Sequence, residues 1–268
     1  MILTRSKLGL FRYVLYGHAL LVTAFLLLPI VFIALLSLGS SRWLAFPPPA
    51  WTFKWYEELA SDPRWMESLW LSLRLALCVT ILSVLLGGAA AFALARGKFR
   101  GRRLLKAFFV SPMIAPVVIV AIALYSFSLK MGLNGTFIGF VAGHLIVAVP
   151  FSVICIVNSL RSFDLALEQA AAICGAGRLQ TLRRVTIPCI APGVMAAAIF
   201  SFLASWDEVV ISIFMASPQL QTLPVRMWTS LRMDLTPVIA AVSTLLVLAS
   251  MLLMVVLGLV FVRRSPKQ

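Results

Sequence analysis

The sequence predicts an all-α membrane protein with six transmembrane helices. Of its 268 residues, 62% are hydrophobic and 12% are charged, whereas soluble domains average about 45–50% apolar and about 25% charged residues. The apolar residues form long runs, and the Lys and Arg residues lie in the short gaps between them. A water-soluble fold could not bury so much apolar surface, so these runs are expected to cross a bilayer.

Six apolar segments are long enough, because crossing the hydrocarbon takes about 20 residues at about 1.5 Å each. They are expected at about residues 13–38, 69–95, 107–129, 139–159, 189–216 and 238–262. The first run is longer than the roughly 7–15 apolar residues of a signal peptide, which indicates an uncleaved anchor. Pro112, Pro116 and Pro150 are expected to kink the third and fourth helices. We predict a single transmembrane domain over residues 1–268, with helix 13–38 peripheral to core helices within 69–262.

The distribution of positive charge predicts the orientation. Counting alternate gaps gives 16 Lys and Arg residues on one side and six on the other, with Arg74 inside the second segment. The 16 include Arg5 and Lys7 near the N-terminus and Arg263, Arg264 and Lys267 near the C-terminus. Positive charge is retained in the cytoplasm, so both termini and the gap 160–188 are expected there. The aromatic residues of the external loop 39–68 are expected at headgroup level; they are Trp43, Trp51, Trp55, Tyr56 and Trp65.

Several classes of function are not indicated. The net charge of +14 could suit a nucleic-acid-binding protein, but the cations do not cluster on a basic face between aromatic residues. The four cysteines have neither CxxC spacing nor neighbouring histidines, so no metal site or disulfide framework is predicted. No GxxxxGK[ST] nucleotide-binding loop occurs. If ATP drives this protein, the ATPase must be another polypeptide.

The gap 160–188 reads LRSFDLALEQAAAICGAGRLQTLRRVTIP and predicts a helix, a turn and a second helix on the cytoplasmic face. Asp164 can cap a helix over 165–174, and Gly175 can end it. A second helix over 179–185 is expected to end before Pro188. The small residues at 170–172 and 175–177 would let another protein approach closely. The alternative is an interfacial helix whose arginines contact anionic lipid; these arginines are Arg178, Arg183 and Arg184.

This loop resembles the permeases of type I ABC importers, which carry the pattern E-A-A, three residues, G, nine residues, I-x-L-P. Gln169, Ala170 and Ala171 occupy the first three places, Gly175 follows at the correct distance, and Val185 to Pro188 occupy the last four. Gln replaces Glu at 169, and Glu168 is the neighbouring carboxylate. The resemblance implies that the loop is a coupling helix that docks in a cleft of an ATPase subunit. The expected coupling residues are Glu168, Gln169, Ala170, Ala171, Gly175, Arg178, Arg183 and Pro188.

The resemblance extends from Trp51 to Val260 and is strongest with the spermidine/putrescine branch, at residues 53–59, 95–105, 205–214 and 222–241. It implies a non-catalytic permease that forms half of the solute pathway in the bacterial inner membrane. The implied partners are a second related permease, an ATPase dimer that holds ATP and Mg, an extracytoplasmic solute-binding protein and membrane lipids. The chain itself is expected to bind no cofactor. Solutes of other related permeases remain alternatives: amino-acid derivatives, opines, phosphonates and iron.

Asp207 and Glu208 lie in the fifth apolar segment, where a carboxylate facing lipid would cost several kcal/mol. Such residues are candidates for a solute path. For a polyamine, carboxylates in the cavity would offset the desolvation of its ammonium groups, and Trp206 could add a cation–π contact. The alternatives are that the pair contacts a partner permease, or that it lies in a helix break without touching solute. If one of the two carboxylates faces the cavity, Asp207 is favoured.

Two other classes of protein are less consistent with the sequence. A self-sufficient secondary transporter would often show inverted repeats, which are absent here, and would not need the coupling-type loop. A membrane-embedded enzyme would need a clustered nucleophile, base or metal site, and Asp207 and Glu208 have no histidine next to them in sequence. His18 and His144 are expected to be packed or hydrogen-bonded.

Overall fold

The computed structural model describes residues 9–233 and 236–264, with side chains described for 12–233 and 236–252. The predicted cytoplasmic cations Arg5, Lys7 and Lys267 lie outside the described residues, as do the side chains of Arg263 and Arg264. The chain divides into two compact units. One unit combines residues 1–63 with 229–268, and the other is Arg64–Trp228.

The first unit contains α1 (Gly9–Ser37), α2 (Lys54–Ser61) and α12 (Pro237–Arg264). The most apolar stretch of α1 has no buried residue, so lipid or a partner protein must cover it. The loop between α1 and α2 is held by the indole N–H of Trp55, which donates to the carbonyl oxygen of Gly39 at 2.5 Å. Trp55 and Trp65 are buried within the protein, and the depth of the five aromatic residues of 39–68 relative to the headgroups stays a prediction.

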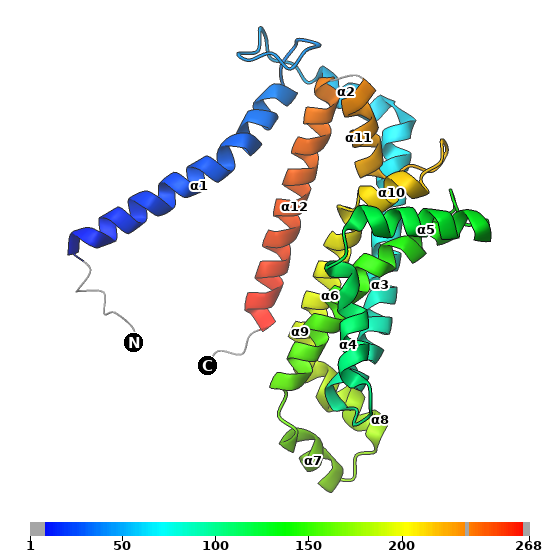
Figure 1. Cartoon of the computed structure of the whole chain (residues 1–268). Coiled ribbons are helices and arrows are strands. Elements are labelled where there is room, and N and C mark those ends of the chain that lie inside the picture. The colour runs from blue at the N-terminus through cyan, green and yellow to red at the C-terminus, as the bar shows by residue number, and fades with distance from the viewer. Residues whose placement is uncertain (1–8, 234–235, 265–268) are drawn as a thin grey trace. The chain divides into compact units, whose positions relative to one another are not determined.

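The second unit holds most of the helices. These are α3 (Pro63–Arg96), α4 (Arg102–Val110), the 3-10 turn η1 (Ser111–Met113), α5 (Val117–Met131), α6 (Phe137–Ser162), α7 (Ala166–Ile173), α8 (Arg178–Thr181), the π-helical turn η2 (Leu182–Thr186), α9 (Ile187–Trp206), α10 (Val210–Met215) and the start of α11 (Leu223–Met233). In Figure 1, α3, α6 and α9 lie side by side, while α7 and α8 lie at the end of the unit away from α10.

The core of this unit lies where α3, α6 and α9 meet. One apolar cluster joins Ala91 and Leu94 of α3 to residues of α6 and α9, including Val157 and Ile190. The helices approach so closely that a Cβ atom on Gly87 would lie 2.6 Å from the Cβ of Ser152. Small residues at helix interfaces permit such contact in membranes.

A buried triangle of hydroxyls crosses the same interface. Ser83 of α3, Ser152 of α6 and Ser201 of α9 hydrogen-bond to one another at 2.8–3.0 Å. Ser201 also donates to the carbonyl oxygen of Ala148 at 3.2 Å. Because each hydroxyl has a partner, these polar groups link the three helices instead of destabilising the apolar interior.

The prediction of one helix over 107–129 is wrong. The chain forms α4 and η1, then turns into α5, and the two parts are bent by 97°. Pro112 lies in η1 and Pro116 precedes the first residue of α5. Two prolines four residues apart remove two backbone donors and disfavour helical geometry in the residues before them, so the helix breaks between them. Pro150, in contrast, lies inside a continuous α6.

The helix content agrees with an all-α membrane protein. Among the described residues, four helices are long and apolar enough to span a membrane, or five if the bent pair is one span. Within the described residues, α12 contributes a shorter apolar helix, Pro237–Leu252. The count of six therefore stays a prediction, and so does the division into one domain.

Candidate functional site

The loop between α6 and α9 folds as a short helix, a tight turn and a second short helix. The side-chain oxygen of Asp164 accepts a hydrogen bond from the backbone N–H of Ala166 at 2.9 Å, so the predicted cap is present. Gly175 has φ of +82°. The N–H groups of Gly175 and Ala176 donate to the carbonyls of Ala172 and Ala171, both at 3.0 Å. This is a Schellman ending, in which glycine takes the left-handed position.

The prediction that the second helix ends before Pro188 is wrong. α8 runs into the π-helical turn η2, and α9 begins at Ile187, with Pro188 in its first turn. Proline is tolerated there because the first N–H groups of an α-helix have no intrahelical acceptor. The loop is thus joined to α9 without an interruption, so a displacement of α8 would be passed directly to α9.

Glu168 ties this loop to the end of α3. Its carboxylate accepts hydrogen bonds from both terminal nitrogens of Arg96, at 2.5 and 3.1 Å, and from the hydroxyl of Thr186 at 2.5 Å. The hydrogen bond from Arg96 is the main cause that lowers the pKa of Glu168 below its ordinary value, against a smaller opposing effect of burial. Glu168 therefore acts within this chain, linking α7, α3 and η2.

The ion pair between Arg96 and Glu168 is expected to hold the loop to α3 in a pH-dependent way. The folded-state pKa of Glu168 is lowered. The stability that the ionised Glu168 adds to the folded protein is therefore fully present above the ordinary glutamate pKa of about 4.3, and it is lost as the pH falls through the lowered pKa. The side chains of Arg96 and Glu168 are 29% and 24% exposed, so solvent screening limits the gain to about 1 kcal/mol or less.

We expect Arg96→Glu to increase protease cleavage of the loop at neutral pH, and the double variant Arg96→Glu with Glu168→Arg to restore part of the protection. Wild-type protection should fall in acid, whereas the protection of Glu168→Gln should not change over the same pH range. Limited proteolysis of the purified protein measures both effects. Equal cleavage of wild type, single and double variants would show that the pair does not hold the loop.

The other predicted coupling residues are mostly on the surface of this loop. Gln169, Ala170, Arg178, Arg183 and Pro188 are exposed, and Ala171 is half-buried. A hollow of about 390 Å³ lies between the two short helices; it is lined by Glu168, Ala172, Ala176, Arg178, Thr181, Leu182 and Thr186.

Two further surface residues of the loop were missed. Ile173 is 87% exposed and Leu179 is 60% exposed, which is unfavourable for apolar side chains on a water-facing loop. The available signal was two large apolar residues flanking the glycine turn. Their exposure favours a surface that a partner protein covers.

The second candidate site is a helix break after α9. The prediction that Asp207 and Glu208 lie in the middle of a continuous segment 189–216 is wrong, because α9 ends at Trp206 and α10 begins at Val210. The pair does lie in a helix break, as one alternative held, while the second part of that alternative, that the pair does not touch solute, stays a prediction. Non-helical backbone inside a membrane is tolerated only where it is buried in protein or lines a water-filled cavity.

The two carboxylates in this break have different surroundings. Glu208 accepts a hydrogen bond from the backbone N–H of Ile211 at 2.8 Å and so caps the first turn of α10. Asp207 is exposed, and its carboxylate has no hydrogen-bond or ion-pair partner within the described part of the chain. Trp206 stacks on Phe202, with ring centroids 5.6 Å apart. Asp207 is therefore the free charge at this site.

A buried histidine holds the break in place. His144 of α6 is fully buried, with Nδ1 2.9 Å from the hydroxyl of Ser205 and Nε2 2.9 Å from that of Ser212. Ser205 lies in α9 and Ser212 in α10, so one side chain joins the two helices on either side of Asp207. The expectation that His144 is hydrogen-bonded is confirmed. Its positioning role was missed, because the two serines are 61 and 68 residues away in sequence.

Comparison with known proteins places the chain in a family. Residues 83–266 match the model of the binding-protein-dependent transport system inner membrane component. The chain belongs to this family. The expected resemblance to ABC importer permeases is confirmed, and the protein is an inner-membrane, multi-pass transport component.

Named relatives cover nearly the same length. The spermidine/putrescine transport system permease protein PotC of Escherichia coli K12 is 28% identical over 243 residues, which cover 89% of this chain and 90% of the relative. The putrescine transport system permease protein PotI of the same strain is 30% identical over 232 residues, which cover 83% and 81%.

A solved structure has the same fold. A chain of a bacterial ABC transporter involved in the import of the acidic polysaccharide alginate matches with a TM-score of 0.73, covering 99% of this chain and 100% of that one, at 18% identity. At this identity the match concerns the fold alone, and it agrees with the ABC importer permease fold expected from the sequence.

Proposed function

We propose that this permease subunit imports a polyamine or a related cationic amine, with energy from a separate ATPase. Its named relatives, at 28% and 30% identity, are spermidine/putrescine and putrescine permeases. The observation that carries the solute class is the unpaired carboxylate of Asp207 in the break between α9 and α10. A free carboxylate suits an ammonium group through charge-assisted hydrogen bonds, and Trp206, its neighbour in sequence, is the candidate for a cation–π contact.

The loop between α6 and α9 suggests how the transport functions are divided between this chain and its proposed partners. The surface around Gly175, with exposed Ile173 and Leu179, suits contact with an ATPase dimer that would hold ATP and Mg. A second permease would complete the pathway, and an extracytoplasmic binding protein would deliver the solute. In this proposal the chain holds no cofactor and catalyses no reaction itself.

Transport by the reconstituted complex tests the solute class. We expect ATP-dependent uptake of labelled putrescine into proteoliposomes that contain the permease pair, its ATPase and its binding protein. 1,4-Butanediol is the matched control, since it has the same chain length without amines, and ATP should not increase its uptake above passive entry. Uptake of an anionic solute in place of putrescine would support the alternative that the chain serves another solute.

The proposed orientation puts both termini and the α7–α8 loop in the cytoplasm. Gln180 and Gln219 are both exposed and should lie on opposite sides of the membrane. In a cysteine-free background, an impermeant thiol reagent added outside intact cells should label Gln219→Cys and should label Gln180→Cys only after permeabilisation. Strong labelling of position 180 from outside would reverse the orientation.

A further inference from the structure

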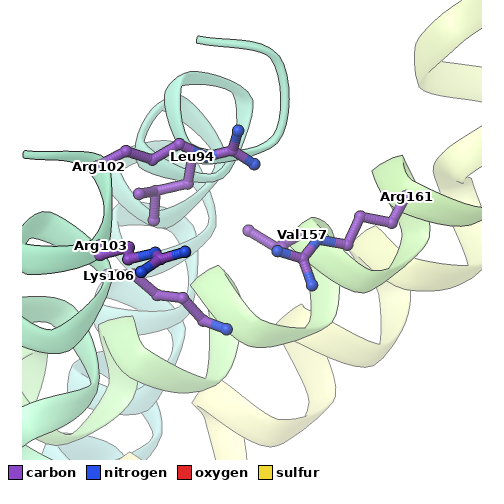
Figure 2. Close-up of a pocket in the computed structure, with 6 residues that line it drawn as sticks. All are labelled: Leu94, Arg102, Arg103, Lys106, Val157 and Arg161. Atoms are coloured by element: carbon purple, nitrogen blue, oxygen red, sulfur yellow. The ribbon is translucent and has the colours of Figure 1, made fainter. Parts of the chain in front are cut away.

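A pocket that neither candidate site uses lies between α4 and the adjoining ends of α3 and α6. Its volume is about 370 Å³, and six residues line it: Leu94, Arg102, Arg103, Lys106, Val157 and Arg161. Figure 2 shows the charged ends of Arg103, Lys106 and Arg161 directed toward the same space, with Leu94 and Val157 forming an apolar part of the wall.

The positive charges of this pocket are not neutralised within the described part of the chain. None of the four cations has an ion pair or hydrogen bond to an acidic side chain there, whereas Arg96, in the last turn of α3, is paired with Glu168. Like charges that face one space repel each other, so an anion in the pocket would relieve that repulsion. Arginine is suited to phosphate, because its planar guanidinium can donate two parallel hydrogen bonds.

The surroundings of the pocket favour a phosphate attached to an acyl chain. In α4, Leu105 and Phe109 pack against the core cluster, while Leu104 and Phe108 are 78% and 70% exposed. The helix thus carries both exposed apolar side chains and three of the pocket's four cations, which is the pattern of a helix at a membrane surface. Basic pockets between helices on the cytoplasmic side are suited to anionic headgroups.

We propose that this pocket binds the phosphate group of an anionic phospholipid in the cytoplasmic leaflet. The lipid would fix α4 against α3 and α6. The site is separate from Asp207 and from the coupling surface around Gly175, and the proposal depends on the proposed orientation but on no choice of solute.

Lipid binding to the assembled transporter tests the site. The complex is placed in phosphatidylcholine nanodiscs that contain a small fraction of spin-labelled phosphatidylglycerol, and the immobilised fraction is measured at about 0.5 M salt, where long-range attraction is screened within a few ångströms. Both faces of a nanodisc are accessible, so the result does not depend on the orientation.

The test variant is Arg103→Gln with Lys106→Gln. The matched control is Lys98→Gln with Arg100→Gln, which removes the same charge from exposed positions outside the pocket. We expect the pocket variant to bind phosphatidylglycerol roughly tenfold or more weakly, since each cation near an anionic lipid contributes about fivefold. The control should change less than about twofold, because its cations do not line the pocket and act only through long-range attraction that the salt screens. Arg103→Lys with Lys106→Arg keeps the charge and should keep most of the binding.

Three outcomes would overturn the proposal. Equal losses in the pocket variant and the control would show general surface attraction. Displacement of the lipid by millimolar inorganic phosphate would assign the pocket to free phosphate. Loss of the ATPase subunit from the pocket variant, with lipid binding unchanged, would make the pocket a protein contact.

Discussion

Replacing Gly175 with Val is expected to abolish solute-stimulated ATP hydrolysis and uptake while the protein remains in the membrane. Gly175 has φ of +82°, a conformation that costs an L-residue about 1–2 kcal/mol and a β-branched residue more. A Cβ at this position meets nothing within 4 Å inside the chain, so the added side chain would project into the space where the partner is proposed to dock. The turn would then change shape, or the partner would be displaced.

Two variants separate these causes. Gly177 also has open space around its Cβ, but its φ of −72° is ordinary, so Gly177→Val adds bulk without backbone strain. Gly175→Asn adds a side chain that tolerates left-handed geometry. If the left-handed backbone of residue 175, and not side-chain bulk, is what coupling requires, Gly175→Asn should keep much of the activity and Gly177→Val should be near wild type. Normal solute-stimulated hydrolysis in Gly175→Val, measured on intact complex in proteoliposomes, would remove the coupling assignment.

The sequence predicted the elements of the loop well because they depend on local chemistry. The Asp164 cap and the Gly175 ending each involve residues within five positions of one another, where side-chain capping and glycine geometry decide the structure. The end of α8 was predicted wrongly because proline was interpreted as a terminator. Proline at the start of a helix is equally favourable, and only the π-helical turn of η2 decides between the two.

The breaks in the third and fifth apolar segments were harder to predict because average hydropathy stays high across them. Pro112 and Pro116 were expected to kink one helix, but the pair ends it. Glu208, three positions before Ile211, is a capping signal that the apolar run concealed. The pairs Arg96 with Glu168 and His144 with Ser205 join residues 72 and 61 positions apart, and a single sequence carries no signal for such contacts.

Asp207→Asn is expected to weaken uptake of putrescine by well over tenfold, as measured per assembled complex. The substitution keeps the size of the side chain and removes its charge, and the loss of one partner from a desolvated charge pair costs about 2–5 kcal/mol. Glu208→Gln is the matched control. Its amide oxygen can still accept the hydrogen bond from the N–H of Ile211, so the cap of α10 should persist, and uptake should change less than for Asp207→Asn.

The comparison distinguishes a solute contact from a structural role. Loss of uptake with normal assembly and normal basal ATP hydrolysis would place Asp207 on the solute path, since the motor would then be intact and only the cation would lack its partner. Loss of uptake because Asp207→Asn no longer assembles with the second permease would make the residue structural. Normal transport by the assembled variant would remove the physical support for a cationic solute, because the other carboxylate of the break, Glu208, is already engaged by Ile211.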